Sequence, residues 1–124
     1  PWLPVNENYL EINAKQQLED PASLLCWYQQ LIALRKRSEW SEVLALGSER
    51  HLPELGQNVL AYVRQLKQKK LLVVCNFQNQ EAEISRFSNH SKSVLSNYGV
   101  PVTEGENWKL RPFEALLIDE SEEK

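Results

Sequence analysis

The side chains best able to do chemistry in this sequence are carboxylates. Hydrolysis of a glycosidic bond with retention needs an acid/base and a nucleophile about 5 Å apart. The 17 acidic residues include only two aspartates: Asp20, which precedes Pro21 and fits a helix cap, and Asp119, which ends an apolar segment near the C-terminus. Four glutamates lie in polar segments that favour a solvated face: Glu81, Glu83, Glu104 and Glu106. We therefore predict no catalytic residue in this chain.

Histidines and cysteines do not form a recognisable metal site. His51, His90, Cys26 and Cys75 show no pair at the spacing of structural zinc or of a His-Glu-x-x-His helix. With only four glycines, a phosphate-binding loop is not expected either. Both cysteines lie in apolar patterns, where a thiol acts as a small hydrophobe. We predict no metal, no cofactor and no disulfide.

Charge and hydropathy exclude several classes of partner. The net charge is −3 and the 14 basic residues are spread along the chain, so the sequence predicts no concentrated positive surface that would bind nucleic acid. No run approaches the ~20 apolar residues of a membrane helix, and the N-terminus lacks signal-peptide features. We expect a cytoplasmic location. The sequence begins Pro1-Trp2 and has no methionine, so we expect that processing or truncation removed its beginning.

The N-terminal third should contain one helix. Residues 1–19 predict an extended loop, because they hold two prolines and three asparagines. A helix over residues 20–37 is indicated by Asp20-Pro21 at its start and by three basic residues at its end. Its apolar residues recur at three and four residue steps and form one stripe: Leu24, Trp27, Tyr28, Leu31 and Leu34.

After residue 41 the pattern changes to short β-rich segments separated by turn formers. We predict strands at 43–46, 51–55, 59–66, 71–77, 81–87, 92–97, 108–110 and 114–119. Residues 59–66 and 71–77 should form a hairpin, with 71–75 as a central strand. We expect helix and sheets to pack as one body. Exposed Trp108 or Tyr98 would suit stacking on sugar rings, as in a carbohydrate-binding module.

Several segments resemble oligo-1,6-glucosidases, dextran glucosidases and trehalose-6-phosphate hydrolases of the α-amylase superfamily. Residues 1–9 (PWLPVNENY), 12–13, 17–23 and 28–36 (YQQLIALRK) are similar to the loop and helix that end the catalytic barrel of these enzymes. Residues 58–64, 70–77, 95–98 and 110–115 (LRPFEA) resemble their C-terminal domain. Glu7 replaces a usual proline, and residues 38–57 match loosely.

The resemblance implies a mainly β fold. It would be an antiparallel Greek-key β-sandwich of the α-amylase C-terminal type, preceded by an amphipathic helix left over from a (β/α)8 barrel. Residues 1–40 would end the barrel and 41–124 would form the sandwich. The parent would be a retaining, exo-acting α-glucosidase whose catalytic aspartate and glutamate lie on earlier strands. Asn6 and Tyr9 become candidates for shaping its substrate pocket.

Three functional alternatives follow. The chain is a non-catalytic structural domain whose partner is the parent's catalytic barrel, with an α-linked gluco-oligosaccharide as the parent's substrate. The sandwich could instead be a carbohydrate-binding module that uses Trp108. The parent could also be a trehalose-6-phosphate hydrolase. Without its barrel, the apolar stripe would favour self-association.

Overall fold

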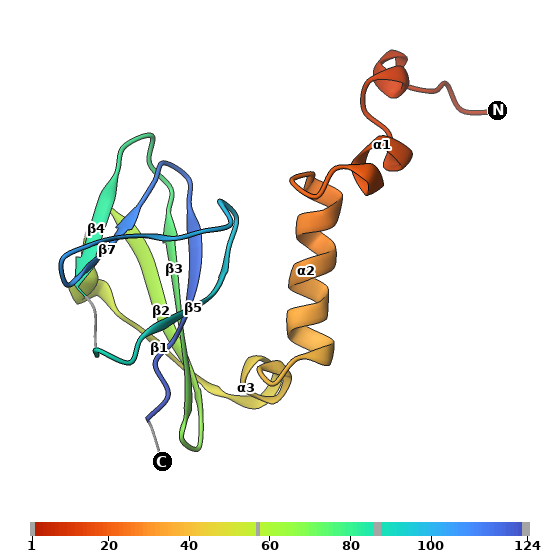
Figure 1. Cartoon of the computed structure of the whole chain (residues 1–124). Coiled ribbons are helices and arrows are strands. Elements are labelled where there is room, and N and C mark those ends of the chain that lie inside the picture. The colour runs from red at the N-terminus through yellow and green to blue at the C-terminus, as the bar shows by residue number, and fades with distance from the viewer. Residues whose placement is uncertain (1, 57, 86–87, 123–124) are drawn as a thin grey trace. The chain divides into compact units, whose positions relative to one another are not determined.

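The computed structural model describes residues 2–56, 58–85 and 88–122, and it divides the chain into two compact units. The first is Pro1–Glu39 and the second is Trp40–Lys124. Figure 1 shows the helices of the first unit and the strands of the second. Pro1 and the last two residues of the predicted strand 81–87 lie outside the described residues.

The segment predicted as an extended loop is largely helical, so that prediction was wrong. It contains the 3-10 helix η1 (Glu7–Leu10) and the helix α1 (Ala14–Glu19). Asn6 and Asn13 cap these helices: the side-chain oxygen of Asn6 accepts from the Asn8 amide, and that of Asn13 accepts from the Gln16 amide. Asparagine favours caps and turns through the same local hydrogen bond, which explains the error.

The predicted helix is present but begins later than expected. Helix α2 spans Leu24–Arg37 and its N-cap is Ser23, whose hydroxyl accepts from the Cys26 amide. Asp20 does not cap α2, since its carboxylate accepts from the Ala22 amide in the turn before the helix. Gln17 of α1 then ties the two helices together, because its side-chain oxygen accepts from the Leu25 amide. The end of the helix at residue 37 is confirmed.

The predicted strand at 43–46 is instead helix α3 (Ser41–Leu46). Trp40 and Val43 are buried, and α3 contacts the strands that follow it. Gly47 ends the helix where the chain turns into a strand. A Cβ at this position would collide with the carbonyl oxygens of Val43 and Gln65, so only glycine allows the close approach.

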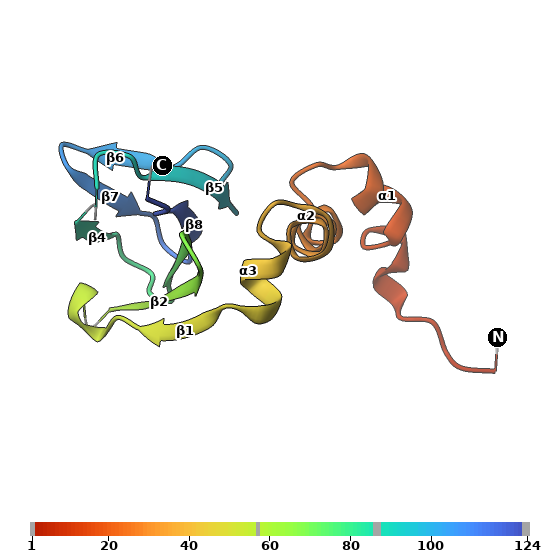
Figure 2. The same cartoon turned by 90° about the horizontal axis from the view of Figure 1, so that it is seen from below.

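In the part of the chain that the structure describes, eight strands form two antiparallel sheets (Figure 2). The larger has the order β1-β2-β3-β8-β5 and the smaller has the order β4-β7-β6. The bounds are β1 Ser48–His51, β2 Val59–Leu66, β3 Lys69–Asn76, β4 Ala82–Ser85, β5 Lys92–Ser96, β6 Val102–Glu104, β7 Asn107–Leu110 and β8 Ala115–Asp119. A 3-10 turn, η2 (Pro53–Leu55), separates β1 from β2.

Most of the predicted strands are confirmed. The hairpin of β2 and β3 turns at Lys67, whose φ of 56° lies in the left-handed region, and β3 is central as expected. The predicted strand at 51–55 was wrong, because β1 ends at residue 51 and Pro53 begins η2. Strand β6 was not predicted. All three of its residues are exposed, so its sequence carries no alternating apolar pattern.

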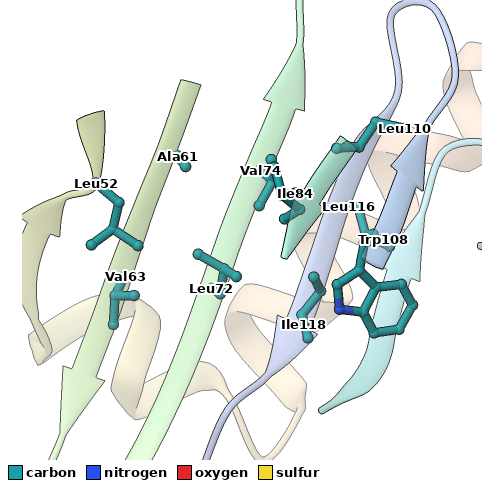
Figure 3. Close-up of a cluster of buried hydrophobic side chains, with 10 residues drawn as sticks. All are labelled: Leu52, Ala61, Val63, Leu72, Val74, Ile84, Trp108, Leu110, Leu116 and Ile118. Atoms are coloured by element: carbon teal, nitrogen blue, oxygen red, sulfur yellow. The ribbon is translucent and has the colours of Figure 1, made fainter. Parts of the chain in front are cut away.

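The two sheets share one apolar core (Figure 3). The larger sheet contributes side chains such as Leu72 and Leu116, and the smaller contributes Ile84, Trp108 and Leu110. Leu72, Leu110 and Leu116 are completely buried. The second unit is therefore an antiparallel two-sheet domain, in agreement with the predicted mainly β fold, and it follows short N-terminal helices where the sequence predicted one helix.

Candidate functional site

The first unit carries an apolar surface rather than an apolar core. No residue of η1, α1 or α2 is buried. Large apolar side chains are exposed throughout it, up to 93% for Trp2. We call the following set the N-terminal apolar surface: Trp2, Leu3, Val5, Tyr9, Leu10, Ile12, Leu18, Leu24, Tyr28 and Ile32. A surface of this kind marks a site of interaction with another protein surface.

Two residues of the predicted apolar stripe, Leu24 and Tyr28, belong to this surface. All five residues of the stripe lie on α2, with Leu24 and Tyr28 exposed and Trp27, Leu31 and Leu34 half-buried. Helix α2 forms because many of its residues have high helix propensity, because Ser23 caps its N-terminus and because the cations in its last turn interact favourably with the helix dipole. Packing inside the unit covers the stripe only in part.

A groove of about 720 Å³ runs along the other side of α2. Positions 26, 30, 33 and 37 are centred about a third of a helical turn away from the centre of the stripe. The groove is lined by five small or polar residues and by three apolar ones, two of which belong to the N-terminal apolar surface: Cys26, Gln29, Gln30, Ala33 and Arg37, with Pro21, Leu18 and Ile32. Helix α2 therefore presents open surface on two sides, as expected of a helix that packs between other elements.

Asn6 and Tyr9, the two candidates for shaping a substrate pocket, lie at the start of this unit. The Asn6 side chain is engaged in capping η1. Tyr9 lies in η1 with its side chain 53% exposed, and its carbonyl oxygen accepts from the Asn13 side chain at 3.1 Å. The ring of Tyr9 is thus open to a partner, whereas the amide of Asn6 has a local structural role.

Trp108, the candidate for stacking on sugar, lies in the other unit and is only 3% exposed. Its ring fills the space between the two sheets (Figure 3), so it offers no face to a ligand. Tyr98 is 46% exposed, but the Arg111 guanidinium lies 4.3 Å from the centre of its ring. Trp108 belongs to the second compact unit, whereas Asn6 and Tyr9 belong to the first.

A fully buried carboxylate, which the sequence did not single out, lies at the start of β8. The Glu114 side chain accepts hydrogen bonds from Ser96 at 2.7 Å and from the Arg111 amide, Nε and Nη2 at 2.9 Å each. Burial raises the pKa of this carboxyl, but the hydrogen bonds from Arg111 and Ser96 outweigh burial and lower the pKa overall. The bidentate hydrogen bonds from Arg111 hold the Glu114 carboxylate in place, which suits a structural role.

Glu120 is the second buried glutamate and has a different environment. Its carboxylate accepts from the hydroxyls of Ser91 and Ser88, and none of the arginines that the structure describes pairs with it. Burial raises its pKa, and these hydrogen bonds only partly offset the effect. It lines a cavity of about 460 Å³ with Lys70 and His90. The two glutamates are not a catalytic pair, because each is committed to hydrogen bonds at a different end of β8.

Among residues 2–56, 58–85 and 88–122, no three His, Cys, Asp or Glu side chains gather as metal ligands. Cys26 and Cys75 are both free thiols. In the same described part of the chain, no helix is long and apolar enough to cross a membrane.

Family models match both parts of the chain. Residues 1–43 match the model of the α-amylase catalytic domain, and residues 50–117 match the model of the maltogenic amylase C-terminal domain. The first match covers the N-terminal apolar surface. The second covers most of the two-sheet unit.

Curated relatives extend the likeness over nearly the whole chain. An oligo-1,6-glucosidase of Bacillus cereus is 37% identical over 95% of this chain and 21% of its own length. A glucan 1,6-alpha-glucosidase of Streptococcus dysgalactiae subsp. equisimilis is 34% identical over 94% of this chain and 21% of its own length. The trehalose-6-phosphate hydrolase of Bacillus subtilis is also 34% identical, over 94% of this chain and 21% of its own length. The chain thus spans about a fifth of the length of these relatives.

Solved structures show the same relationship. The trehalose-6-phosphate hydrolase of Bacillus licheniformis matches with a TM-score of 0.79 and 29% identity, over 98% of this chain and 22% of that chain. The trehalulose synthase of Pseudomonas mesoacidophila matches with a TM-score of 0.77 and 27% identity, over 96% and 22%. The chain therefore belongs to the α-amylase family and corresponds to the C-terminal part of its members, in which the end of a catalytic domain is followed by a maltogenic amylase C-terminal domain.

Proposed function

We propose that this chain completes and stabilises the catalytic barrel of a retaining α-glucosidase that hydrolyses terminal α-glucosidic bonds of oligosaccharides. In this proposal α2 is the last helix of the (β/α)8 barrel, and the two sheets form a Greek-key β-sandwich that follows it. The observation that carries the proposal is the N-terminal apolar surface, which lies within the match to the catalytic domain and has no core of its own.

The role of the surface follows from the chemistry of burial. Apolar side chains gain about 25 cal/mol for each Å² removed from water. Leu24 and Tyr28 on one side of α2, and the groove around Ala33 on the other, would gain this energy against the strands and neighbouring helices of a barrel. In isolation the same surface would favour association between copies of the chain.

The acid/base and the nucleophile belong, in this proposal, to earlier barrel strands. The buried glutamates of this chain do not supply them, because Glu114 is paired with Arg111 and Glu120 is hydrogen-bonded to serines. The part played by the chain in catalysis is indirect: it holds the barrel in the geometry that brings two carboxylates to the required separation. A cytoplasmic location is part of the proposal, and the free thiols of Cys26 and Cys75 fit it.

A chimeric enzyme tests the proposal. In it, this chain replaces the matching C-terminal fifth of the Bacillus cereus oligo-1,6-glucosidase. We expect a soluble protein that releases nitrophenol from p-nitrophenyl α-glucoside, whereas the same enzyme truncated before the junction should be insoluble or inactive. Activity in the truncated enzyme equal to that of the chimera would contradict the proposal.

The substrate of the parent has a close alternative, since both an oligo-1,6-glucosidase and trehalose-6-phosphate hydrolases are among the similar proteins. The chimera cannot choose between them, because its substrate pocket comes from the other enzyme. The natural polypeptide that carries residues 1–124 should be assayed with isomaltose and with trehalose 6-phosphate. We expect the higher kcat/KM for isomaltose, and the reverse would make the parent a trehalose-6-phosphate hydrolase.

A further inference from the structure

A cavity of about 460 Å³ lies in the second unit, beside the start of β3 and the end of β8. Its volume falls in the range of about 300–1,000 Å³ that small-molecule pockets occupy. Strands β1 to β3, the β4–β5 connection and the chain after β8 all contribute to its wall. The side chains that give it its chemical character are Arg50, Val63, Lys70, His90, Glu120 and Glu122. We call it the Glu120 cavity.

The backbone holds Glu120 firmly at this cavity. Its amide donates to the Lys70 carbonyl oxygen at 2.9 Å, and the Lys70 amide donates to the Ser121 hydroxyl at 3.1 Å. The chain after β8 therefore stays attached to β3 beyond the last paired residue of the strand. A carboxylate fixed in this way binds a ligand with little further loss of conformational entropy.

The Glu120 carboxylate can accept more hydrogen bonds than the fold supplies. The residue is only 9% exposed, and its oxygens accept from the hydroxyls of Ser91 at 2.5 Å and Ser88 at 3.4 Å. An ionised carboxylate offers about four lone-pair positions. Burial raises the pKa of this carboxyl because the two neutral hydroxyls replace only part of the lost hydration. Further hydroxyl donors in the cavity would stabilise the charged form.

The charges around the cavity balance one another. Two cationic and two anionic side chains line it: Arg50, Lys70, Glu120 and Glu122. Lys70 Nζ lies 3.8 Å from a carboxylate oxygen of Glu122, and the Arg50 guanidinium lies at the same distance from that of Glu54. An anionic ligand would be repelled by Glu120, and a cationic ligand by Lys70 and Arg50. A neutral ligand with hydroxyl groups avoids both costs, because each hydroxyl can donate to a carboxylate and accept from a cation.

We propose that the Glu120 cavity binds a glucopyranose ring, either as free glucose or as the end of a gluco-oligosaccharide. Two neighbouring hydroxyls donate to the Glu120 carboxylate, the Lys70 ammonium donates to a sugar oxygen, and Val63 provides an apolar wall for the C–H groups of the ring. The cavity itself selects a neutral polyhydroxyl compound. The choice of glucose among such compounds rests on the proposed function, in which the parent acts on α-glucosidic bonds.

Titration of the isolated chain with glucose, followed by two-dimensional amide NMR, tests this site. We expect the signals of residues 88–91 and 119–122 to shift and to saturate with a Kd on the order of 1 mM. Inorganic phosphate should leave these signals unchanged. Methyl α-glucoside has a blocked anomeric oxygen, as at the end of an oligosaccharide, and it separates the two sources of the ring. Binding equal to that of glucose assigns the cavity to chain ends, and weaker binding assigns it to free glucose.

The variant Glu120→Gln should raise the Kd for glucose about tenfold or more, because hydrogen bonds to a charged acceptor are stronger than those to a neutral one. The amide oxygen can still accept from Ser91, so the variant should keep its fold. Glu106→Gln is the matched control. It makes the same substitution in the exposed turn between β6 and β7, away from the residues that line the cavity, and should leave the Kd unchanged.

The site is overturned if neither sugar gives saturable shifts, or if Glu120→Gln binds glucose as tightly as the original chain. Saturable shifts with phosphate in place of the sugars also overturn it, because the ligand is then an anion. The outcome is separate from that of the proposed function. An active chimera built from a chain that does not bind glucose contradicts only this site, whereas glucose binding by a chain whose chimera is inactive contradicts only the proposed function.

Discussion

Replacing Glu114 by glutamine is expected to lower the free energy of unfolding by about 2–4 kcal/mol, because it breaks a buried ion pair and leaves buried donors without an acceptor. The Glu114 carboxylate is completely buried and accepts from Arg111 and Ser96. The Arg111 side chain is 27% exposed, which keeps the expected loss below the upper end measured for fully buried pairs. Urea denaturation of the isolated chain at pH 7 measures the difference.

The same carboxylate should make stability depend on pH. The folded-state pKa of Glu114 lies below its ordinary value of 4.5. A depressed pKa in the folded state means that the group stabilises the fold above pH 4.5 and loses this contribution as the pH falls through the folded-state pKa. The unfolding free energy of the original chain should therefore fall in acid more steeply than that of Glu114→Gln.

Glu120→Gln is the matched control, since it makes the same substitution at the other buried glutamate of the β8 region. The folded-state pKa of Glu120 is raised, chiefly by burial, so its charge opposes folding at neutral pH and the cost is relieved as the pH falls towards 4.5. The glutamine should be neutral or slightly stabilising at pH 7, because its oxygen can still accept from Ser91. Equal destabilisation by both substitutions would contradict this assignment of the two sites.

The second large effect is expected from Leu24→Asp in helix α2. Leu24 is 65% exposed in this structure, so an aspartate there should change the stability of the isolated chain by less than about 0.5 kcal/mol. In the chimera the same side chain should face the barrel, where an unpaired carboxylate costs several kcal/mol. We therefore expect an insoluble or inactive chimera, measured as soluble yield and as turnover of p-nitrophenyl α-glucoside.

Lys15→Asp provides the comparison, because it introduces the same charge at an exposed and already polar position of α1. The Lys15→Asp chimera should keep its activity. Full activity of the Leu24→Asp chimera would show that the barrel does not cover this part of the N-terminal apolar surface.

The sequence predicted elements well where a long periodic pattern or a strong hairpin signal was present. Helix α2 and the hairpin of β2 and β3 are of this kind. Residues 43–46 were predicted wrongly because a short apolar run fits a strand or a helix equally well. The helix forms because burying Trp40 and Val43 against the sheet requires it, which is tertiary information. The cap at Ser23 was missed because Asp20-Pro21 offered a stronger local signal three residues earlier.

The candidate sites were less predictable than the fold. The α2 stripe was found from its spacing, but the groove along another side of α2 also contains small and polar residues that a hydrophobic pattern does not detect. Trp108 was a candidate for sugar binding although Asn107-Trp108-Lys109-Leu110 alternates polar and apolar residues, a short pattern that places Trp108 on the same buried face as Leu110. One of the hydrogen bonds that hold the Glu114 carboxylate comes from Ser96. Ser96 is 18 residues away in sequence and becomes a neighbour only through the pairing of β5 with β8.

The claim that this chain supports a catalytic domain without supplying its catalytic groups is tested most directly by assaying the purified chain alone. Nitrophenol release from p-nitrophenyl α-glucoside should be measured at equal molar concentrations of the chain and of the chimera. We predict turnover by the chimera and a rate indistinguishable from buffer for the chain. A rate that rises in proportion to the concentration of the isolated chain would contradict the account.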